Sequence, residues 1–287
     1  MRAQPWEFLV KDTPSRDWAE GSGALIAVAF FFGGTAGGLY LLSLYFNNIW
    51  GMFIAWLFAL GMGLFDIAHL GNKAIAWRIA LRPRSSWISR GLLFVVSFIG
   101  FGAIQMALTH WAPGTSAEIV FKVLAGIAAL GVATYSGFVI SYVSCIKFWH
   151  SAIMPVLFIV AGLTCGTGIL MVVFSITDPM QFETIKTFSL FILPANIIIV
   201  AMHLWISTYN SATAHNSVRT IVKGSLAWIF WVVVVIIGSI IPITIALVSD
   251  AGTQALLIVN AVLILAGNLA LRYTILKAGM YPSLLSL

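Results

Sequence analysis

The sequence predicts an all-α integral membrane protein with eight transmembrane helices in one domain, residues 1–287. Apolar residues make up 61% of the chain and charged residues only 8%, whereas an ordinary soluble domain carries about 25% charged residues. The apolar residues occur in long runs, and a chain in hydrocarbon must pair its backbone amides within such a run by forming a helix. We expect the eight helices to pack as two four-helix bundles.

Each apolar run has about the 20 residues that cross about 30 Å of hydrocarbon. Residues 1–22 precede the first run and mix Trp6, Phe8 and Trp18 with charged side chains. This composition predicts an interfacial segment and no cleavable signal peptide. The predicted spans are 23–46, 51–71, 91–111, 119–143, 151–176, 187–208, 224–248 and 254–276.

Positive charge is distributed very unevenly between the two predicted sides. An even number of spans places both termini on one side, which receives thirteen of the fifteen Lys and Arg residues, five of them in the basic loop 72–90. The other side receives Lys122 and Lys186. By the positive-inside rule, the termini and the basic loop are predicted to be cytoplasmic, in a prokaryotic cytoplasmic membrane. A basic loop can also be a docking surface for an acidic partner.

Asp66 and His69 stand one helical turn apart at the end of the second span, so they share a helix face. Ionisable groups at membrane depth are candidates for function, and such a pair can hold one imidazole tautomer and exchange a proton. The alternative is a helix-end His bonded to a loop carbonyl, with Asp66 paired to a nearby Arg. The basic loop that follows favours the functional interpretation.

Tyr135 lies inside the fourth span, away from the expected interfacial aromatic belt. A buried phenol needs a hydrogen-bond partner, either on a neighbouring helix or on a ligand carbonyl, and the sequence alone slightly favours the neighbouring helix. The first span carries the small-residue cluster Gly33–Gly38. This cluster predicts close helix packing, and it is compatible with a flat backbone surface for a planar ligand at Gly34 and Gly38.

Other patterns exclude several kinds of site. Cys145 and Cys165 stand alone, without metal-ligand spacing, so no metal site is expected. No span carries two histidines at the separation that ligands to two stacked haems require, so no haem is expected. Nothing indicates a nucleotide or nucleic-acid site. Polar residues within spans could form a proton path, but helix-to-helix bonding is the better interpretation: Gln105, Asn196, His203, Asn260 and Asn268.

Several short motifs, in this order and spacing, resemble the NrfD and polysulfide-reductase family of membrane subunits, including DMSO-reductase-type anchors. The resemblance covers most of the chain. This chain departs from the family pattern at two places. It has no histidine in Ala27–Phe30, where some relatives have one, and it has Gly91 where some anchors have Glu. The motifs are Gly33–Gly38, His69–Asn72 with Trp77–Arg78, Ser86–Gly91, Tyr135–Gly137, Phe148–Ser151, Pro155–Phe158, Leu271–Tyr273 and Lys277–Pro282.

The resemblance implies a haem-free quinone subunit of an anaerobic respiratory oxidoreductase, using menaquinone or ubiquinone. Such a subunit docks an iron–sulfur ferredoxin-like protein that serves a molybdenum- or tungsten-containing catalytic subunit, so the clusters and the metal cofactor belong to the partners. The terminal substrate then reacts elsewhere than on this chain. The family's quinone-site tyrosine corresponds to Tyr135, and the anchors' quinone-site histidine corresponds to His69.

The leading hypothesis is therefore quinone or quinol redox among the first four spans. Tyr135 and His69 would hydrogen-bond the quinone carbonyls, and His69 with Asp66 would handle protons. The basic loop with Trp87 and Arg90 would dock the iron–sulfur partner and form part of the pocket wall. Two other hypotheses stay open: a secondary transporter or proton channel that uses Asp66 and His69, and a purely structural membrane anchor.

Overall fold

The computed structural model describes residue 9, residues 11–71 and residues 73–284, without the side chains of residues 73–75. Within this part, eight helices are long and apolar enough to cross a membrane, which confirms the predicted all-α membrane fold. The predicted roles of Trp6, Phe8 and Asn72 fall on residues outside the described part.

The spans follow the predicted order and lie close to the predicted boundaries. They are α2 (Ala24–Tyr45, preceded by the 3-10 turn η2, Gly21–Gly23), α3 (Ile49–His69), α4 (Trp87–Trp111), α5 (Ser116–Ser141), α6 (Ile153–Thr177), α7 (Pro179–Asn210), the π-helix η4 (Ile229–Ile240) continued by α9 (Ile241–Val248), and α10 (Gln254–Lys277). The shorter elements are β1 (Thr13–Pro14), η1 (Arg16–Trp18), η3 (Lys73–Leu81), α8 (Ala212–Val222) and β2 (Met280–Tyr281).

Four helices, α3, α4, α5 and α7, begin two to eight residues earlier than predicted, and a polar side chain caps each start. Asp178 Oδ1 accepts hydrogen bonds from the backbone N–H groups of Met180 and Gln181, at 3.1 and 3.3 Å, and Pro179 occupies the first turn. Ser86 Oγ likewise accepts from Ser89 N at the start of α4. The last residues of the predicted basic loop 72–90, from Trp87 on, are therefore the first turn of α4, and Lys73–Leu81 forms the 3-10 helix η3.

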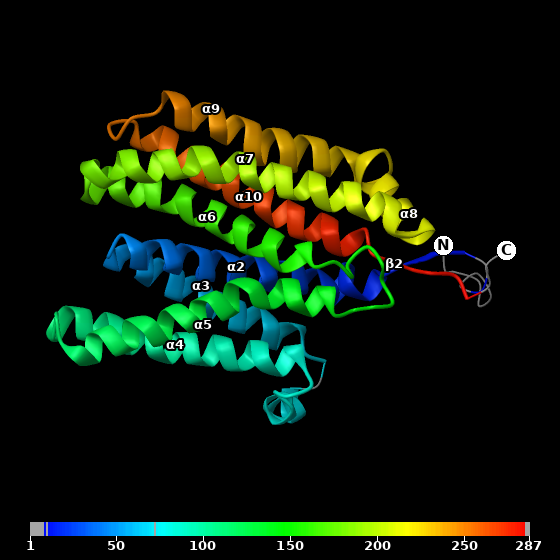
Figure 1. Cartoon of the computed structure of the whole chain (residues 1–287), viewed down its shortest axis with the longest axis horizontal. Coiled ribbons are helices and arrows are strands. Elements are labelled where there is room, and N and C mark those ends of the chain that lie inside the picture. Colours follow the sequence, from blue (N-terminus) through cyan, green and yellow to red (C-terminus); the bar gives the residue numbers. More distant parts are fainter. Residues whose placement is uncertain (1–8, 10, 72, 285–287) are drawn as a thin grey trace.

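Helix α2 occupies the centre of the molecule and packs against α3, α5, α6 and α10 (Figure 1). Its glycines permit this close approach. A Cβ atom on Gly37 would lie 2.6 Å from the Ala129 carbonyl oxygen of α5, and one on Gly38 would clash with the Gly162 backbone of α6. Close packing is thus confirmed for this cluster. Because α2 joins both halves of the chain, the division into two four-helix bundles stays a prediction.

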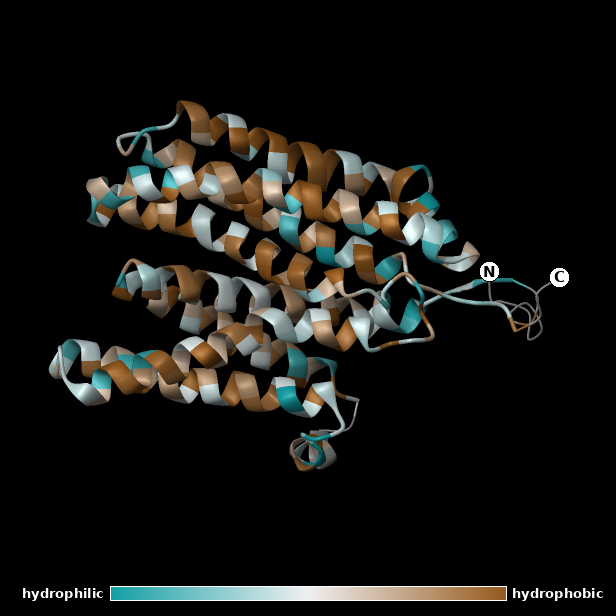
Figure 2. Cartoon of the chain, viewed as in Figure 1, coloured by the Kyte–Doolittle hydropathy of each residue, from teal (hydrophilic) through white to brown (hydrophobic). Residues whose placement is uncertain are grey.

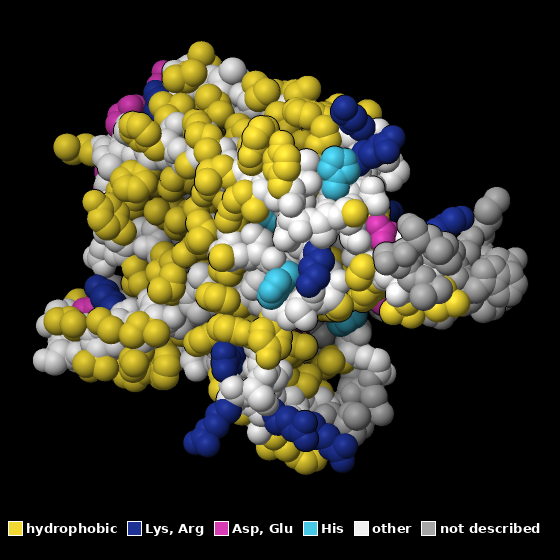
Figure 3. Space-filling view, turned by 45° about the vertical axis from the view of Figure 1, so that its right-hand side comes forward, with side chains coloured by type: hydrophobic (Ala, Val, Ile, Leu, Met, Phe, Trp, Pro, Cys, Tyr) yellow, Lys and Arg dark blue, Asp and Glu magenta, His cyan; other side chains and the backbone are white. Residues whose placement is uncertain are grey.

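The described segments nearest the two chain ends, β1 and β2, lie at the same end of the helices (Figure 1). There β1 pairs with β2 in antiparallel register, with Thr13 opposite Tyr281. Apolar residues follow the helices along their length, while hydrophilic residues gather toward their ends (Figure 2). The end that carries β1, η3, α8 and β2 is called the basic end below, and Figure 3 shows dark-blue Lys and Arg side chains gathered there.

Candidate functional site

Five of the seven predicted site residues lie toward the basic end, where α3 ends, α4 begins and α5 approaches its last turn: Asp66, His69, Trp87, Arg90 and Tyr135. His69 is fixed by a contact between its Nδ1 atom and the Ser22 carbonyl oxygen, at 3.0 Å. A carbonyl can only accept a hydrogen bond, so Nδ1 carries a proton and Nε2 is the ring nitrogen left for a ligand. The loop-carbonyl bond of the alternative interpretation is therefore present, and it also selects the tautomer.

Asp66 is half-buried on the same face of α3, one turn inside His69. It lies close enough to both His69 and Tyr135 for a charge on its carboxylate to act on each. The ion pairs found in the described part of the chain join other residues, so Asp66 has no Arg partner there. Asp66 therefore lies near both of the other predicted groups, His69 and Tyr135.

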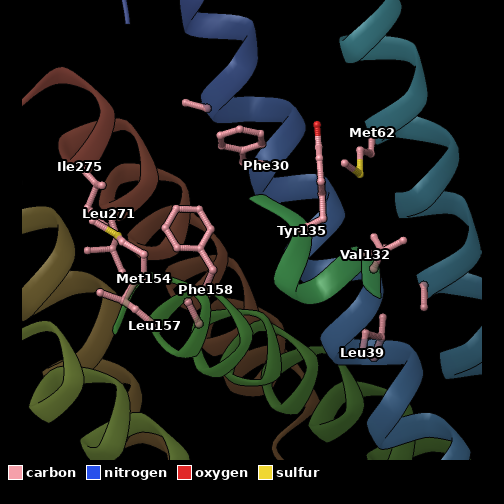
Figure 4. Packing of buried hydrophobic residues seen from close by; sticks show 14 of the residues in the cluster. Phe30, Leu39, Met62, Val132, Tyr135, Met154, Leu157, Phe158, Leu271 and Ile275 are labelled. Atoms are coloured by element: carbon pink, nitrogen blue, oxygen red, sulfur yellow. The ribbon is translucent and has the colours of Figure 1, made fainter. Parts of the chain in front are cut away.

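Tyr135 is 7% exposed, and its ring packs directly on the bare backbone of Gly91 at the start of α4. Phe30 of α2 meets the same ring edge-to-face, with 6.2 Å between ring centroids. Figure 4 shows Tyr135 between Phe30 and Met62 of α3. Among the described residues the Tyr135 hydroxyl donates no hydrogen bond to a neighbouring helix. The site thus holds the ring firmly and leaves the hydroxyl available.

Replacing Gly91 with alanine should destabilise the protein, because the new Cβ atom would clash with the Tyr135 ring. Overpacking of this kind costs about 1–3 kcal/mol, which exceeds the gain of about 1 kcal/mol that Ala otherwise brings to a helix. The matched control is Gly100→Ala in the same helix, where a Cβ atom would meet nothing within 4 Å. Thermal unfolding in detergent should rank Gly91→Ala below wild type and Gly100→Ala at or above it. The reverse order would contradict this packing.

Trp87 and Arg90 connect α4 to α5 and to the basic loop. The Trp87 ring stacks on Phe138 of α5, with centroids 4.4 Å apart and planes within 4°. The Arg90 guanidinium lies over the Trp87 ring, 4.5 Å from its centroid. Its Nε donates to the Pro83 carbonyl at 2.8 Å, and its Nη2 donates to the Arg84 carbonyl at 2.7 Å. Arg90 therefore holds the loop in place.

The outer surface of the loop is both basic and apolar. Arg78, Arg82 and Arg84 are exposed, and so are Trp77 and Leu81, at 61% and 62%. Beneath this surface lies a cleft of about 750 Å³. It begins at Leu70, the residue after His69, and its walls come from η3 and the start of α4. The loop and this cleft thus begin directly after the helix end that carries His69.

Gly34 and Gly38 are covered by protein groups. A Cβ atom on Gly34 would clash with the Arg272 guanidinium of α10, and Gly38 lies against Gly162. The contacts of these two glycines are therefore those of helix packing, and their predicted contact with a ligand stays a prediction.

The polar residues within the spans fall into two groups. Gln105 connects helices, because Tyr40 donates to its Oε1 at 2.8 Å and its Nε2 donates to Thr109 Oγ1 at 2.8 Å. In the part of the chain that the structure describes, other buried side chains keep polar atoms without a hydrogen-bond partner. Among the residues predicted from the sequence these are Asn196, His203, Asn260 and Asn268. The Nδ2 groups of Asn260 and Asn268 are paired, with Met171 Sδ at 3.9 Å and with the Ile264 carbonyl at 3.1 Å.

Arg272 is a buried cation that entered the sequence-based prediction only as part of a C-terminal motif. It is 1% exposed, and its guanidinium lies 4.6 Å from the centroid of the Phe158 ring. Its Nη2 donates to the Phe158 carbonyl at 3.4 Å. A charged residue within an apolar span is itself a signal of importance, so this residue could have been singled out from the sequence.

Two comparisons with known proteins indicate the family of this chain. A family model described as "Polysulphide reductase, NrfD" matches residues 22–282. The C subunit of polysulfide reductase from Wolinella succinogenes is 25% identical over 170 residues, which are 55% of this protein and 53% of that subunit. The protein thus spans about half the length of this curated relative.

Proposed function

The chain belongs to the polysulphide reductase NrfD family, and we propose that it is the quinone-interacting membrane subunit of a respiratory oxidoreductase. In this role it passes electrons between the quinone pool, menaquinone or ubiquinone, and an iron–sulfur partner. The observation that carries the proposal is the pairing of two available polar atoms beside Asp66. These atoms are the Tyr135 hydroxyl and His69 Nε2.

The residues present fit a planar ligand with two carbonyl groups. The Tyr135 ring is fixed between Gly91 and Phe30, so its hydroxyl can donate a hydrogen bond in one direction without a further ordering cost. His69 already uses Nδ1 on Ser22, so only Nε2 is free to bind. A bound quinone supplies reversible two-electron, two-proton chemistry.

His69 and Asp66 are proposed to move the protons. Neutral His69 accepts a proton at Nε2 from a quinol hydroxyl, and the imidazolium donates it back in the reverse direction. The Asp66 carboxylate, one turn away, stabilises the imidazolium through its opposite charge. The Ser22 carbonyl keeps the ring orientation unchanged during both steps.

The basic loop is proposed to dock the iron–sulfur ferredoxin-like subunit, with a molybdenum- or tungsten-containing catalytic subunit beyond it. Three exposed arginines, Arg78, Arg82 and Arg84, surround apolar side chains on one surface. Such a surface combines electrostatic steering with an apolar contact area. Arg90 holds the loop against the start of α4. Because the loop follows His69 directly in the chain, a partner docked there is proposed to lie near the quinone site.

The proposed location is the cytoplasmic membrane of a prokaryote, with the basic end in the cytoplasm. The excess of Lys and Arg on that end supports this orientation through the positive-inside rule. A docking role for the basic loop would account for five of the thirteen charges predicted for that side without reference to orientation, and Arg272, another of the thirteen, is buried within α10.

Purification of the tagged chain from its native membranes tests the proposal. We expect an iron–sulfur protein and extractable quinone in the preparation, without haem absorption. The double substitution Arg82→Glu with Arg84→Glu should release the iron–sulfur protein, because it reverses two exposed charges of the docking surface. The matched control is Lys147→Glu, an exposed basic residue at the same end but outside the loop.

Three results would contradict the proposal. Solute or proton flux through the isolated chain would support the transporter alternative. A complete complex that retains no quinone and shows no quinol-dependent turnover would support the structural anchor. A haem spectrum from this chain would indicate a cytochrome.

A further inference from the structure

A second cleft lies in the other half of the molecule, between α7, α8 and η4, and plays no part in the proposed quinone chemistry. Its volume is about 680 Å³, within the range of about 300–1,000 Å³ typical of ligand sites. Most of its wall is apolar, including Val200, Leu204, Phe230 and Val234. The geometry is therefore that of a site for an apolar chain.

The cleft runs deep into the membrane region. Its wall extends along α7 from Tyr209, next to the last residue of that helix, to Asn196. The thirteen-residue separation along the helix corresponds to about 20 Å. One leaflet of a bilayer contributes about half of the 30 Å hydrocarbon thickness. The cleft is thus long enough to hold one acyl chain of a lipid along its length.

Cations stand at the mouth of the cleft. Arg219 of α8 and Lys223, the C-cap residue of α8, line the cleft. The same two residues also line a separate polar basin of about 540 Å³. The basin also contains Lys11, Asp12 and Asn216. Asp12 is already used as an acceptor, by Thr213 Oγ1 at 3.2 Å and Asn216 Nδ2 at 2.9 Å. The basin therefore keeps a net positive charge.

Aromatic residues mark the membrane surface at this same level. Trp205, Tyr209 and Trp231 line the cleft and are exposed by 68%, 73% and 47%. Tryptophan and tyrosine gather at membrane interfaces, and Trp231 Nε1 donates to the Val222 carbonyl at 3.0 Å, which fixes it beside the cations. Figure 3 shows Lys, Arg and His side chains next to a yellow hydrophobic flank at this end.

We propose that these two adjoining spaces form a binding site for one anionic phospholipid. The phosphate lies between Arg219 and Lys223, the headgroup occupies the polar basin, and one acyl chain fills the cleft. The cations stand at headgroup depth, and the apolar wall continues inward from them. A phospholipid has the same arrangement, with a charged headgroup at the surface and an acyl chain that extends inward. Basic pockets between transmembrane helices recognise anionic headgroups in this way. The lipid would connect α8 to α7 and η4.

The test is lipid retention by the purified complex in nanodiscs of phosphatidylcholine with added phosphatidylglycerol, counted by native mass spectrometry. Wild type should retain one phosphatidylglycerol in preference to phosphatidylcholine. The double substitution Arg219→Ala with Lys223→Ala should weaken this retention by a factor on the order of 30, from the usual contribution of two basic residues. Ala201→Trp should also weaken it, because Ala201 lines the cleft and the larger side chain fills it.

The matched control is Arg16→Ala with Lys147→Ala, two exposed basic residues at the same end that line neither space. It should retain the lipid as wild type does. Should the Arg219–Lys223 variant assemble poorly, Ala201→Trp leaves both cations intact and still tests the site. The proposal is overturned by equal retention of both lipids in wild type. It is equally overturned if inorganic phosphate binds at these cations while Ala201→Trp has no effect, because the site would then recognise phosphate alone.

Discussion

Substituting His69 with alanine should abolish quinol-dependent turnover of the complex while leaving its assembly intact. The imidazole is proposed to receive the quinol proton at Nε2, and a positioned acid–base group contributes about 10²- to 10⁴-fold to rate. Its only described hydrogen bond, from Nδ1 to Ser22, joins a half-buried side chain to the turn before α2. Losing one such bond costs about 1 kcal/mol, which the helix packing tolerates. Turnover with a soluble quinol and co-purification of the iron–sulfur partner measure the two effects.

His150→Ala is the matched control for this experiment. His150 also lies at the basic end, and its Nδ1 also meets a backbone carbonyl, that of Ser141 at 2.8 Å. It differs in being exposed in the segment between α5 and α6. It should therefore keep wild-type turnover. If His69→Ala retained near wild-type turnover with quinone still bound, the assignment of His69 as the proton-handling residue would be wrong.

The membrane topology follows from the sequence because hydrocarbon imposes one simple requirement. Each apolar run had to become a helix, and eight spans were correctly predicted. The boundaries differ where capping adds turns at the membrane surface. Asp178 before Pro179, and Ser86 before Trp87, begin helices in sequence that is less apolar than a span. A hydropathy profile does not detect those first turns, although the capping residues that precede them can be identified in the sequence.

The candidate site was predictable only in part, because its residues come from separate helices. The shared face of Asp66 and His69 follows from their spacing alone. The Ser22 carbonyl that selects the His69 tautomer, and the contact between Gly91 and Tyr135, depend on tertiary packing that periodicity cannot supply. Gly91 was noted only as a departure from the glutamate of some anchors. The Tyr135 ring packs directly on Gly91, so a residue with a side chain at this position would clash with the ring.

The cleft between α7, α8 and η4 illustrates the same limit. Helix α8 was not predicted, since its eleven residues are too short and too polar to register as a span. Arg219 and Lys223 were therefore counted only as charges on one side of the membrane. Only the fold of α8 against α7 and η4 brings these two charges to the mouth of an apolar cleft.

Substituting Tyr135 with phenylalanine should lower quinol-dependent turnover at limiting quinol by about tenfold to a hundredfold, the effect of losing a well-formed buried hydrogen bond. The substitution keeps the ring that packs on Gly91 and meets Phe30, so the fold should be unchanged. Because the hydroxyl is proposed to bind the ligand carbonyl, most of the loss should appear in KM or in quinone retention. His69→Ala, in contrast, should lower kcat. Steady-state kinetics over a range of quinol concentrations separate the two effects.

Tyr40→Phe is the matched control, because Tyr40 is also buried in the membrane region but donates its hydroxyl hydrogen bond to Gln105 Oε1 at 2.8 Å. Its loss leaves Gln105 Oε1 without that donor, so the thermal stability should fall while KM for quinol stays unchanged. Tyr135→Phe should show the opposite pattern, since its hydroxyl donates to no neighbouring helix in the described part of the chain. A Tyr135→Phe variant with wild-type KM and reduced stability would mean that the phenol has a structural role, and the quinone site would then have to lie elsewhere.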